Sequence, residues 1–100
     1  MSLTLIVERT VVPGSQNEIK DLLRELRSGA TRRPGFISGR SVVDAYNPLT
    51  FMTISVWASI SVWEMWENSP ERTAIVERIN DLIQGKPIQR LWLDDEDAPV

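Results

Sequence analysis

The order of strand-like and helix-like segments constrains the fold of this chain more than any other feature of its sequence. Apolar residues recur at every second position in some segments and at every third or fourth position in others, as strands and helices require. The segments follow as strand, helix, strand, strand, helix pair and strand, at 3–12, 15–31, 36–44, 51–57, 59–83 and 88–93. This order predicts an α+β, ferredoxin-like βαββαβ fold, with helices on one face of an antiparallel four-stranded sheet.

The first helix is predicted from its start signal and its apolar stripe. Ser15 and Glu18 form an S-x-x-E capping box, in which each side chain can pair with a free backbone amide. The stripe that follows consists of Ile19, Leu22, Leu23, Leu26 and Ala30. We expect this helix to pack its apolar stripe on the sheet.

Two further helix starts follow the third strand. Ser59 can cap a short helix, and Ser69 can cap a second one, with Pro70 at the first helical position, where its missing N–H has no partner to lose. The second helix is predicted to run to residue 83, because Gly85 and Pro87 stop it there. The sequence thus predicts a helix pair before the last strand.

Three of the four tryptophans lie within ten residues, at Trp57, Trp63 and Trp66. Trp63 and Trp66 share one face of the short helix by their three-residue spacing. We expect this group to help wall a pocket, although each side chain can also serve as core. Trp57 and the fourth tryptophan, Trp92, also suit a dimer interface.

The chain contains no cysteine and no histidine. Their absence removes disulfides, thiolate nucleophiles, the usual zinc sites, histidine general bases and histidine-ligated haem. Outside the acidic end of the chain, the sequence shows no carboxylate cluster suited to a metal. We therefore expect no metal and no bound cofactor.

The charge and hydropathy of the chain bear on its partners and location. Four of the fourteen acidic residues lie at 94–97, so the rest of the chain carries eleven basic and ten acidic groups and offers no nucleic-acid surface. No apolar run approaches the ~20 residues of a membrane span, and the start lacks the basic and apolar regions of a signal peptide. We expect a cytoplasmic protein without a membrane partner.

The length predicts one domain, at 1–93, followed by an acidic C-terminal tail at 94–100 that we expect to be disordered. Helices can cover only one face of the sheet. Ile6, Phe51 and Trp57 indicate that the second face is also partly apolar, and an exposed apolar face of that size marks an interface. We predict a homodimer in which two sheets pack face to face into an α/β barrel.

Four short motifs give the chain a family resemblance: V-x-P-G-S at 11–15, R-P-G-F at 33–36, V-W-x-S at 56–59 and W-x-x-W-x-x-S-P at 63–70. In this order and at these separations they resemble the antibiotic biosynthesis monooxygenase family of small dimeric α/β barrel proteins. The resemblance extends from Leu3 to Trp92. It implies one of several roles, because the family includes cofactor-independent oxygenases of aromatic polyketides and quinones, haem-degrading enzymes and proteins of unknown role.

The haem-degrading branch resembles this chain at Trp66 but departs from it elsewhere. The asparagine and the histidine of that branch fall on Val7 and Val76 here. The resemblance therefore favours the cofactor-independent branch, in which a phenol or hydroquinol is deprotonated, its anion reacts with dioxygen, and a peroxide intermediate collapses to a quinone.

Such chemistry needs an apolar slot for the ring and a donor for the oxyanion. The resemblance and the residue types nominate Trp66, Arg40 and Asn68 as catalytic residues. They nominate Trp63, Trp66, Phe36, Tyr46 and Arg9 as substrate-binding residues. Two alternatives stay open: a non-catalytic module that binds a small ligand, and a structural homodimer whose pocket is filled by its own side chains.

Overall fold

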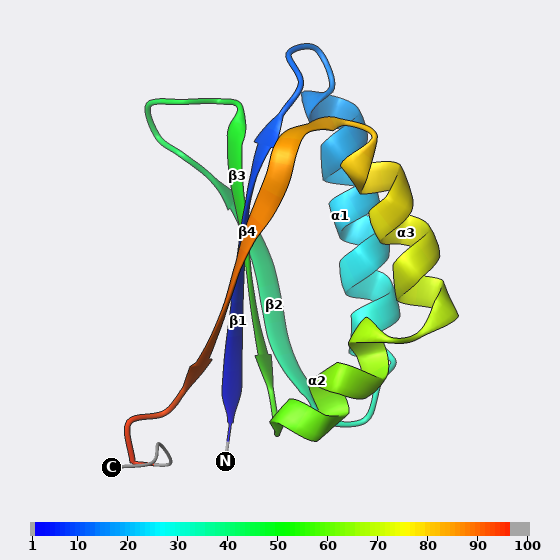
Figure 1. The fold of residues 1–100 in the computed structure, drawn as a ribbon, viewed down its shortest axis with the longest axis vertical. Helices are drawn as coiled ribbons and strands as arrows, with labels where there is room; N and C mark the ends of the chain where they lie inside the picture. The colour runs from blue at the N-terminus through cyan, green and yellow to red at the C-terminus, as the bar shows by residue number, and fades with distance from the viewer. Residues whose placement is uncertain (1, 97–100) are drawn as a thin grey trace.

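Four antiparallel strands form one sheet in the order β2-β3-β1-β4, and the helices cover one of its faces (Figure 1). The computed structural model describes residues 2–96. Its elements are β1 (Leu3–Val11), α1 (Gln16–Thr31), β2 (Phe36–Val43), β3 (Thr50–Trp57), α2 (Ile60–Glu67), α3 (Pro70–Asn80) and β4 (Ile83–Leu93). The predicted βαββαβ order and antiparallel sheet are confirmed.

The last strand is longer than predicted and the helix before it is shorter. α3 ends at Asn80, and β4 begins at Ile83 instead of Ile88. Gly85 and Pro87 therefore lie inside a strand. The sheet tolerates them because β4 is an edge strand, where a proline without an N–H can leave its outer side unpaired.

The helix starts are confirmed, but one of the expected caps is absent. The Ser59 hydroxyl accepts a hydrogen bond from the Val62 amide at 3.3 Å, and the Ser69 hydroxyl accepts one from the Arg72 amide at 3.2 Å. Ser15 makes no such bond, so its predicted capping box does not form. Ser15 is not extended, as an N-cap residue usually is, with φ −99° and ψ 7°.

The register assigns each strand residue to one face of the sheet. Trp57 lies opposite Leu3, and Phe51 lies opposite Arg9. Phe51 and Trp57 are only 2% and 1% exposed and belong to the core. Our assignment of these two aromatic residues to the second face is therefore wrong, because alternation along a strand separates two faces without showing which one the helices cover.

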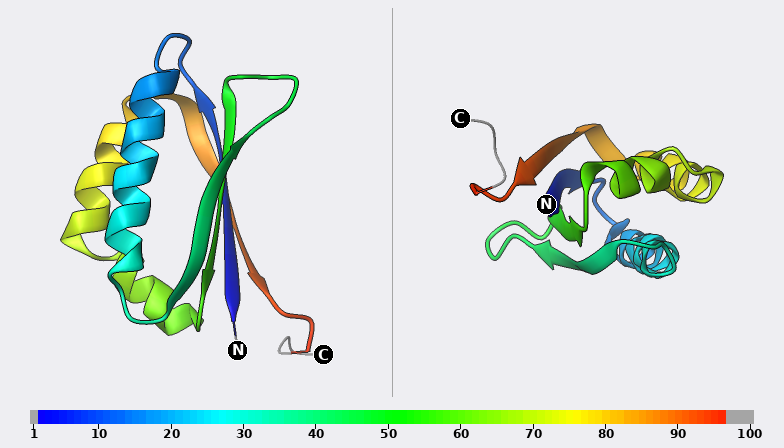
Figure 2. Two further views of the ribbon diagram at one scale, coloured as in Figure 1. Left: turned by 180° about the vertical axis from the view of Figure 1, so that it is seen from behind. Right: turned by 90° about the horizontal axis from the view of Figure 1, so that it is seen from below.

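The face away from the helices is nevertheless partly apolar. Ile6 and Ile54 lie opposite each other at its centre. Trp92, opposite Thr4, is 49% exposed on the same face. Figure 2 shows no helix on this side of the sheet. We call it the open face.

The core under the helices consists of two clusters. One cluster contains Val11, Ile19, Leu22, Leu23, Phe51, Ile75 and Ile79. The other contains Leu3, Ala30, Trp57, Trp63 and Trp66. Leu26 packs against both clusters. The tryptophans are thus concentrated at one end of the helical layer, where α2 lies across the end of the sheet (Figure 1).

No helix within residues 2–96 is long and apolar enough to span a bilayer. The tail predicted at 94–100 reaches beyond the described part of the chain, since positions 97–100 lie outside it. Within the described part, the Ser2 hydroxyl donates a hydrogen bond to the Asp94 carboxylate at 2.6 Å.

Candidate functional site

A cavity of about 70 Å³ lies between the sheet and the helices, where the two core clusters meet. One buried water needs roughly 10–15 Å³ on the same measure, so several waters or part of a small ligand fit inside. Its lining residues are Leu5, Val7, Arg9, Leu23, Leu26, Arg27, Ala30, Phe36, Gly39, Arg40, Ser41, Thr53, Ile54, Ser55, Trp57, Trp63, Trp66 and Arg72.

Aromatic rings form one end of this cavity. The Trp57 and Trp66 rings stack at a centroid distance of 6.5 Å and an angle of 25°, and Phe36 meets Trp57 edge-on at 5.1 Å and 82°. Trp57 is at the end of β3, and Trp66 comes from the inner face of α2 together with Trp63. Aromatic pairs of this kind offer flat, apolar surface to a ring-shaped ligand.

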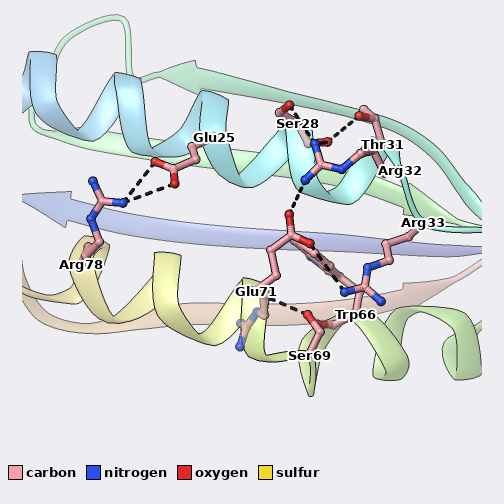
Figure 3. A network of polar contacts seen from close by, with 10 residues as sticks. Glu25, Ser28, Thr31, Arg32, Arg33, Trp66, Ser69, Glu71 and Arg78 are labelled. Carbon is pink, nitrogen blue, oxygen red and sulfur yellow. Dashed lines mark hydrogen bonds and ion pairs between the residues drawn. The ribbon is translucent and has the colours of Figure 1, made fainter.

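The Trp66 ring is held in place from its outer side. The Arg33 guanidinium lies 5.2 Å from the centre of the ring, within the range of a cation–π interaction. Glu71 forms ion pairs with Arg32 and, at 3.7 Å, with Arg33 (Figure 3). A Cβ atom on Gly29 would lie only 2.8 Å from the edge of the Trp66 ring. The close approach of α1 to the Trp66 ring therefore depends on a glycine at position 29.

Arg9 gives the cavity its most unusual polar group. The residue is only 5% exposed, although it lies on β1 with apolar neighbours on the same face. Its Nη1 atom donates to the Thr53 hydroxyl at 3.4 Å, and its Nε atom has no hydrogen-bond partner among residues 2–96. Burial, with a smaller contribution from the charge of Arg72, lowers the pKa of Arg9 to about 10. The guanidinium is therefore still charged at neutral pH.

Arg72 lines the same cavity from the first turn of α3. Its side chain is half-buried, and its Nη1 atom donates to the backbone oxygen of Glu67 at 3.4 Å. Burial lowers the pKa of Arg72, and the charge of Glu67 opposes this shift. Neither Arg9 nor Arg72 forms an ion pair with a carboxylate in the described part of the chain.

The β3 strand adds a polar edge between the aromatic and cationic ends. Thr53 and Ser55 are successive residues on the face that the helices cover, so they lie about 7 Å apart. Thr53 accepts the hydrogen bond from Arg9, and Ser55 accepts one from the Trp57 indole N–H at 3.1 Å. A single substituted ring can span the distance between these hydroxyl groups.

The structure brings together five of the seven residues that the sequence nominated. Trp63, Trp66, Phe36, Arg9 and Arg40 are all among the lining residues, but the register places the exposed Arg40 opposite Ile54, on the open face.

Asn68 and Tyr46 do not line the cavity. Asn68 ends α2, and its side-chain amide donates to the backbone oxygen of Glu64 at 2.9 Å. Tyr46 is 98% exposed in the loop between β2 and β3.

Sequence reasoning did not nominate Arg72, Thr53 or Ser55. The alternation along β3 already put Thr53 and Ser55 on one face with Trp57, so a signal for these two residues was available. No such signal marked Arg72, which looks like any charged residue in the first turn of a helix. Within residues 2–96 no group of three carboxylate side chains could hold a metal ion.

The fold and the cavity together define a class: a small α+β protein with an aromatic pocket, lined also by arginines, between its sheet and its helices. Residues 2–78 match the model of the family described as antibiotic biosynthesis monooxygenase, and the chain belongs to this family. No curated protein matches its sequence.

Solved structures share this fold over nearly the whole chain. A conserved protein from Methanosarcina mazei Go1 aligns with a TM-score of 0.88 at 13% identity, over 92% of this chain and 91% of its own. SnoaB, a cofactor-independent oxygenase from Streptomyces nogalater, aligns with a TM-score of 0.86 at 16% identity, over 99% and 98%. A structure described as an antibiotic biosynthesis monooxygenase gives 0.84 at 21%, over 92% and 97%. At these identities the likeness shows the fold alone.

Proposed function

We propose that this protein is a cofactor-independent monooxygenase that oxidises a small aromatic or quinol substrate in the cavity. The observation that carries the proposal is the pairing of an aromatic wall with a buried arginine whose Nε has no partner in the described chain. Membership of the family and the shared fold with SnoaB support the same function.

The proposed reaction begins with ionisation of the substrate. The ring packs against Trp63, Trp66 and Phe36, and its phenolic oxygen receives hydrogen bonds from Arg9. A buried guanidinium favours the phenolate over the phenol, because it stabilises the charged form inside a site of low dielectric constant. Among the described residues, no carboxylate lines the cavity, so we expect the phenolic proton to leave to water.

The anion then reduces dioxygen, which is the second substrate. A new carbon–oxygen bond gives a hydroperoxide on the ring carbon para or ortho to the phenolate. The oxygen–oxygen bond breaks, the ring carbon loses its hydrogen, and one water leaves. One phenol and one dioxygen thus give one quinone and one water, with no external reductant.

Among the other nominated residues, Arg40 is opposite Ile54 on the open face, so we do not include it as a donor to the ring. We leave Asn68 and Tyr46 out of the proposed site, because the Asn68 amide bonds to its own helix and Tyr46 is in an exposed loop.

The proposal also includes a homodimer formed by the open face, with residues 1–93 as the folded domain and the cytoplasm as its location. Ile88, Leu91 and Trp92 of β4 are 46–54% exposed, and Ile88 and Trp92 are on the open face. Pairing two open faces would bury this apolar surface and provide the second layer that a small sheet lacks.

Oxygen uptake tests the proposal. Purified protein is supplied with a series of phenols and hydroquinones in an oxygen electrode, with autoxidation subtracted. We expect oxygen uptake above that background, with one quinone formed for each dioxygen consumed. We expect this activity to be lost in Arg9→Met. Binding of the same compounds without oxygen uptake would favour the second candidate function, a ligand-binding module. The lack of a carboxylate base among the described lining residues supports this second candidate. The open cavity itself argues against a structural dimer with a filled pocket.

A further inference from the structure

We propose that the substrate carries a carboxylate beside its phenolic hydroxyl, and that Arg72 binds this carboxylate while Arg9 holds the phenolic oxygen. The inference deepens the proposed function by naming the class of substrate, an aromatic hydroxy acid. It rests on the proposed function only for the phenol, since carboxylate binding needs no turnover.

The charged residues that line the cavity among residues 2–96 are all positive. Four arginines line it, and no aspartate or glutamate among residues 2–96 does so; the four are Arg9, Arg27, Arg40 and Arg72. Arg27 and Arg40 are exposed, so water screens them, whereas Arg9 is buried and Arg72 is half-buried. Arg9 therefore has no negative partner in the described chain, and Arg72 is only partly compensated by the charge of Glu67.

Arg9 and Arg72 line the same cavity with few hydrogen bonds of their own. The charge of Arg72 adds a smaller contribution than burial to the lowered pKa of Arg9, as expected for two cations that line one cavity. Their hydrogen bonds to the protein are few and long: one to the Thr53 hydroxyl and one to the Glu67 backbone oxygen, each at 3.4 Å. Both side chains keep donors that a ligand can use.

A single phenolate would neutralise only one of these charges. An ordinary phenol has a pKa of about 10 and is neutral when it arrives at pH 7, whereas an aromatic carboxylic acid arrives ionised. A carboxylate also presents two oxygens, which match the planar fork of an arginine. A ligand with both groups compensates both arginines.

Burial decides which group goes to which arginine. The carboxylate is the more strongly hydrated anion at neutral pH, so it suits Arg72, which is closer to solvent. The phenolic oxygen suits Arg9, where the low dielectric constant promotes its ionisation. Because both arginines line one small cavity, we place the two groups at neighbouring positions of the ring. The ring then extends along Thr53 and Ser55 toward Trp57 and Trp66.

Binding of simple probes tests the inference without turnover. Salicylate, benzoate, phenol and phenyl phosphate are titrated by calorimetry at low and high salt, with tryptophan fluorescence as a second signal. We expect salicylate to bind most tightly, benzoate next, and phenol about 10- to 100-fold more weakly than salicylate, as expected for the loss of one hydrogen-bonded charge. Phenol binding as tight as that of salicylate would overturn the inference. Tighter binding of phenyl phosphate than of salicylate would also overturn it and indicate that the site binds a phosphate instead of a carboxylate.

A pair of variants on one helix makes the test specific. Arg72→Gln removes the proposed carboxylate ligand, and Arg78→Gln removes an equal charge from the exposed part of α3, where Arg78 pairs with Glu25 outside the cavity. Arg72→Gln should reduce salicylate affinity to that of phenol and leave phenol unchanged, while Arg78→Gln should change neither. If both variants lose salicylate affinity equally, the affinity comes from general charge attraction, and the carboxylate site at Arg72 is refuted. Thermal melts confirm that both variants fold.

The outcomes separate this inference from the proposed function. If salicylate binds tightly but no hydroxy acid supports oxygen uptake, the carboxylate site is supported and the oxygenase activity is refuted. If neutral phenols support oxygen uptake as efficiently as hydroxy acids do, the oxygenase activity is supported and the carboxylate site is refuted.

Discussion

The Nη1 atom of Arg9 lies 3.4 Å from the Thr53 hydroxyl, and no other hydrogen bond of this buried guanidinium is found within residues 2–96. A buried charge with one long, uncharged contact destabilises a fold. Because this charge lies on the cavity wall, we propose that Arg9 binds a ligand there.

Arg9→Met separates binding from stability. Methionine fills similar space without a charge, so we expect the free energy of unfolding to rise by about 1–3 kcal/mol while ligand binding and oxygen uptake are lost. Urea denaturation measures the first effect and calorimetry the second. Arg78→Met serves as the control, because an exposed ion pair contributes about 0–1 kcal/mol. A clear loss of stability in Arg9→Met would mean that Arg9 is structural.

The stability gain of Arg9→Met should depend on pH. The pKa of Arg9 is lowered in the fold to about 10, so above pH 10 the unfolded chain binds more protons than the folded one. The free energy of unfolding of the wild type therefore increases as the pH rises above about 10, by at most about 1.4 kcal/mol per pH unit. The difference between wild type and Arg9→Met should be constant from pH 7 to 9 and narrow above pH 10. A constant difference up to pH 11 would contradict the lowered pKa.

Gly29→Ala should act on the pocket from outside it. In an ordinary helix this change stabilises by roughly 0.5–1 kcal/mol. Here the new Cβ would meet the Trp66 ring at 2.8 Å and the Glu71 carboxylate at 2.7 Å. We expect a loss of about 1–3 kcal/mol and a shifted tryptophan emission spectrum, because Trp66 must move. Lys20→Ala, at an exposed position of α1 away from Trp66 and Glu71, is the control and should change little. A stabilised Gly29→Ala protein would show that the contact relaxes freely.

Trp66 is both core and pocket wall, so its truncation has two effects. The side chain is 4% exposed and stacks on Trp57. Trp66→Ala should cost about 3–5 kcal/mol and leave too little folded protein for a binding test. Trp66→Phe retains much of the packing, and we expect it to fold, to bind the ring more weakly and to lower oxygen uptake. Unchanged ligand affinity in folded Trp66→Phe would remove Trp66 from the site.

The sequence predicted the order and type of the elements because each has its own period and start signal. It could not tell which face of β3 the helices cover, since Phe51 and Trp57 alternate with Ile54 and Val56 and both sets are apolar. The register with β1 resolves this point by placing Trp57 opposite Leu3.

The candidate site was predictable only in part, and the reason is again spatial. Trp63, Trp66 and Arg9 carried local signals: aromatic residues on one helix face and a charge in an apolar strand. Arg72 became a site residue only through the packing of α3 against the sheet, which brings its charge near that of Arg9. No spacing in the sequence connects residues that are 63 positions apart.

The open face offers a test of the predicted homodimer. Trp92→Glu introduces a charge among the apolar residues of the open face, where Trp92 lies opposite Thr4 and is 49% exposed. If two such faces pack together, burying that charge without a partner should cost several kcal/mol and yield monomers. Sedimentation velocity measures the mass, and Tyr46→Glu is the control, since Tyr46 is in an exposed loop. If Trp92→Glu is still a dimer at micromolar concentration, the interface does not involve the open face around Trp92. If the wild-type protein is a monomer, the predicted homodimer is wrong.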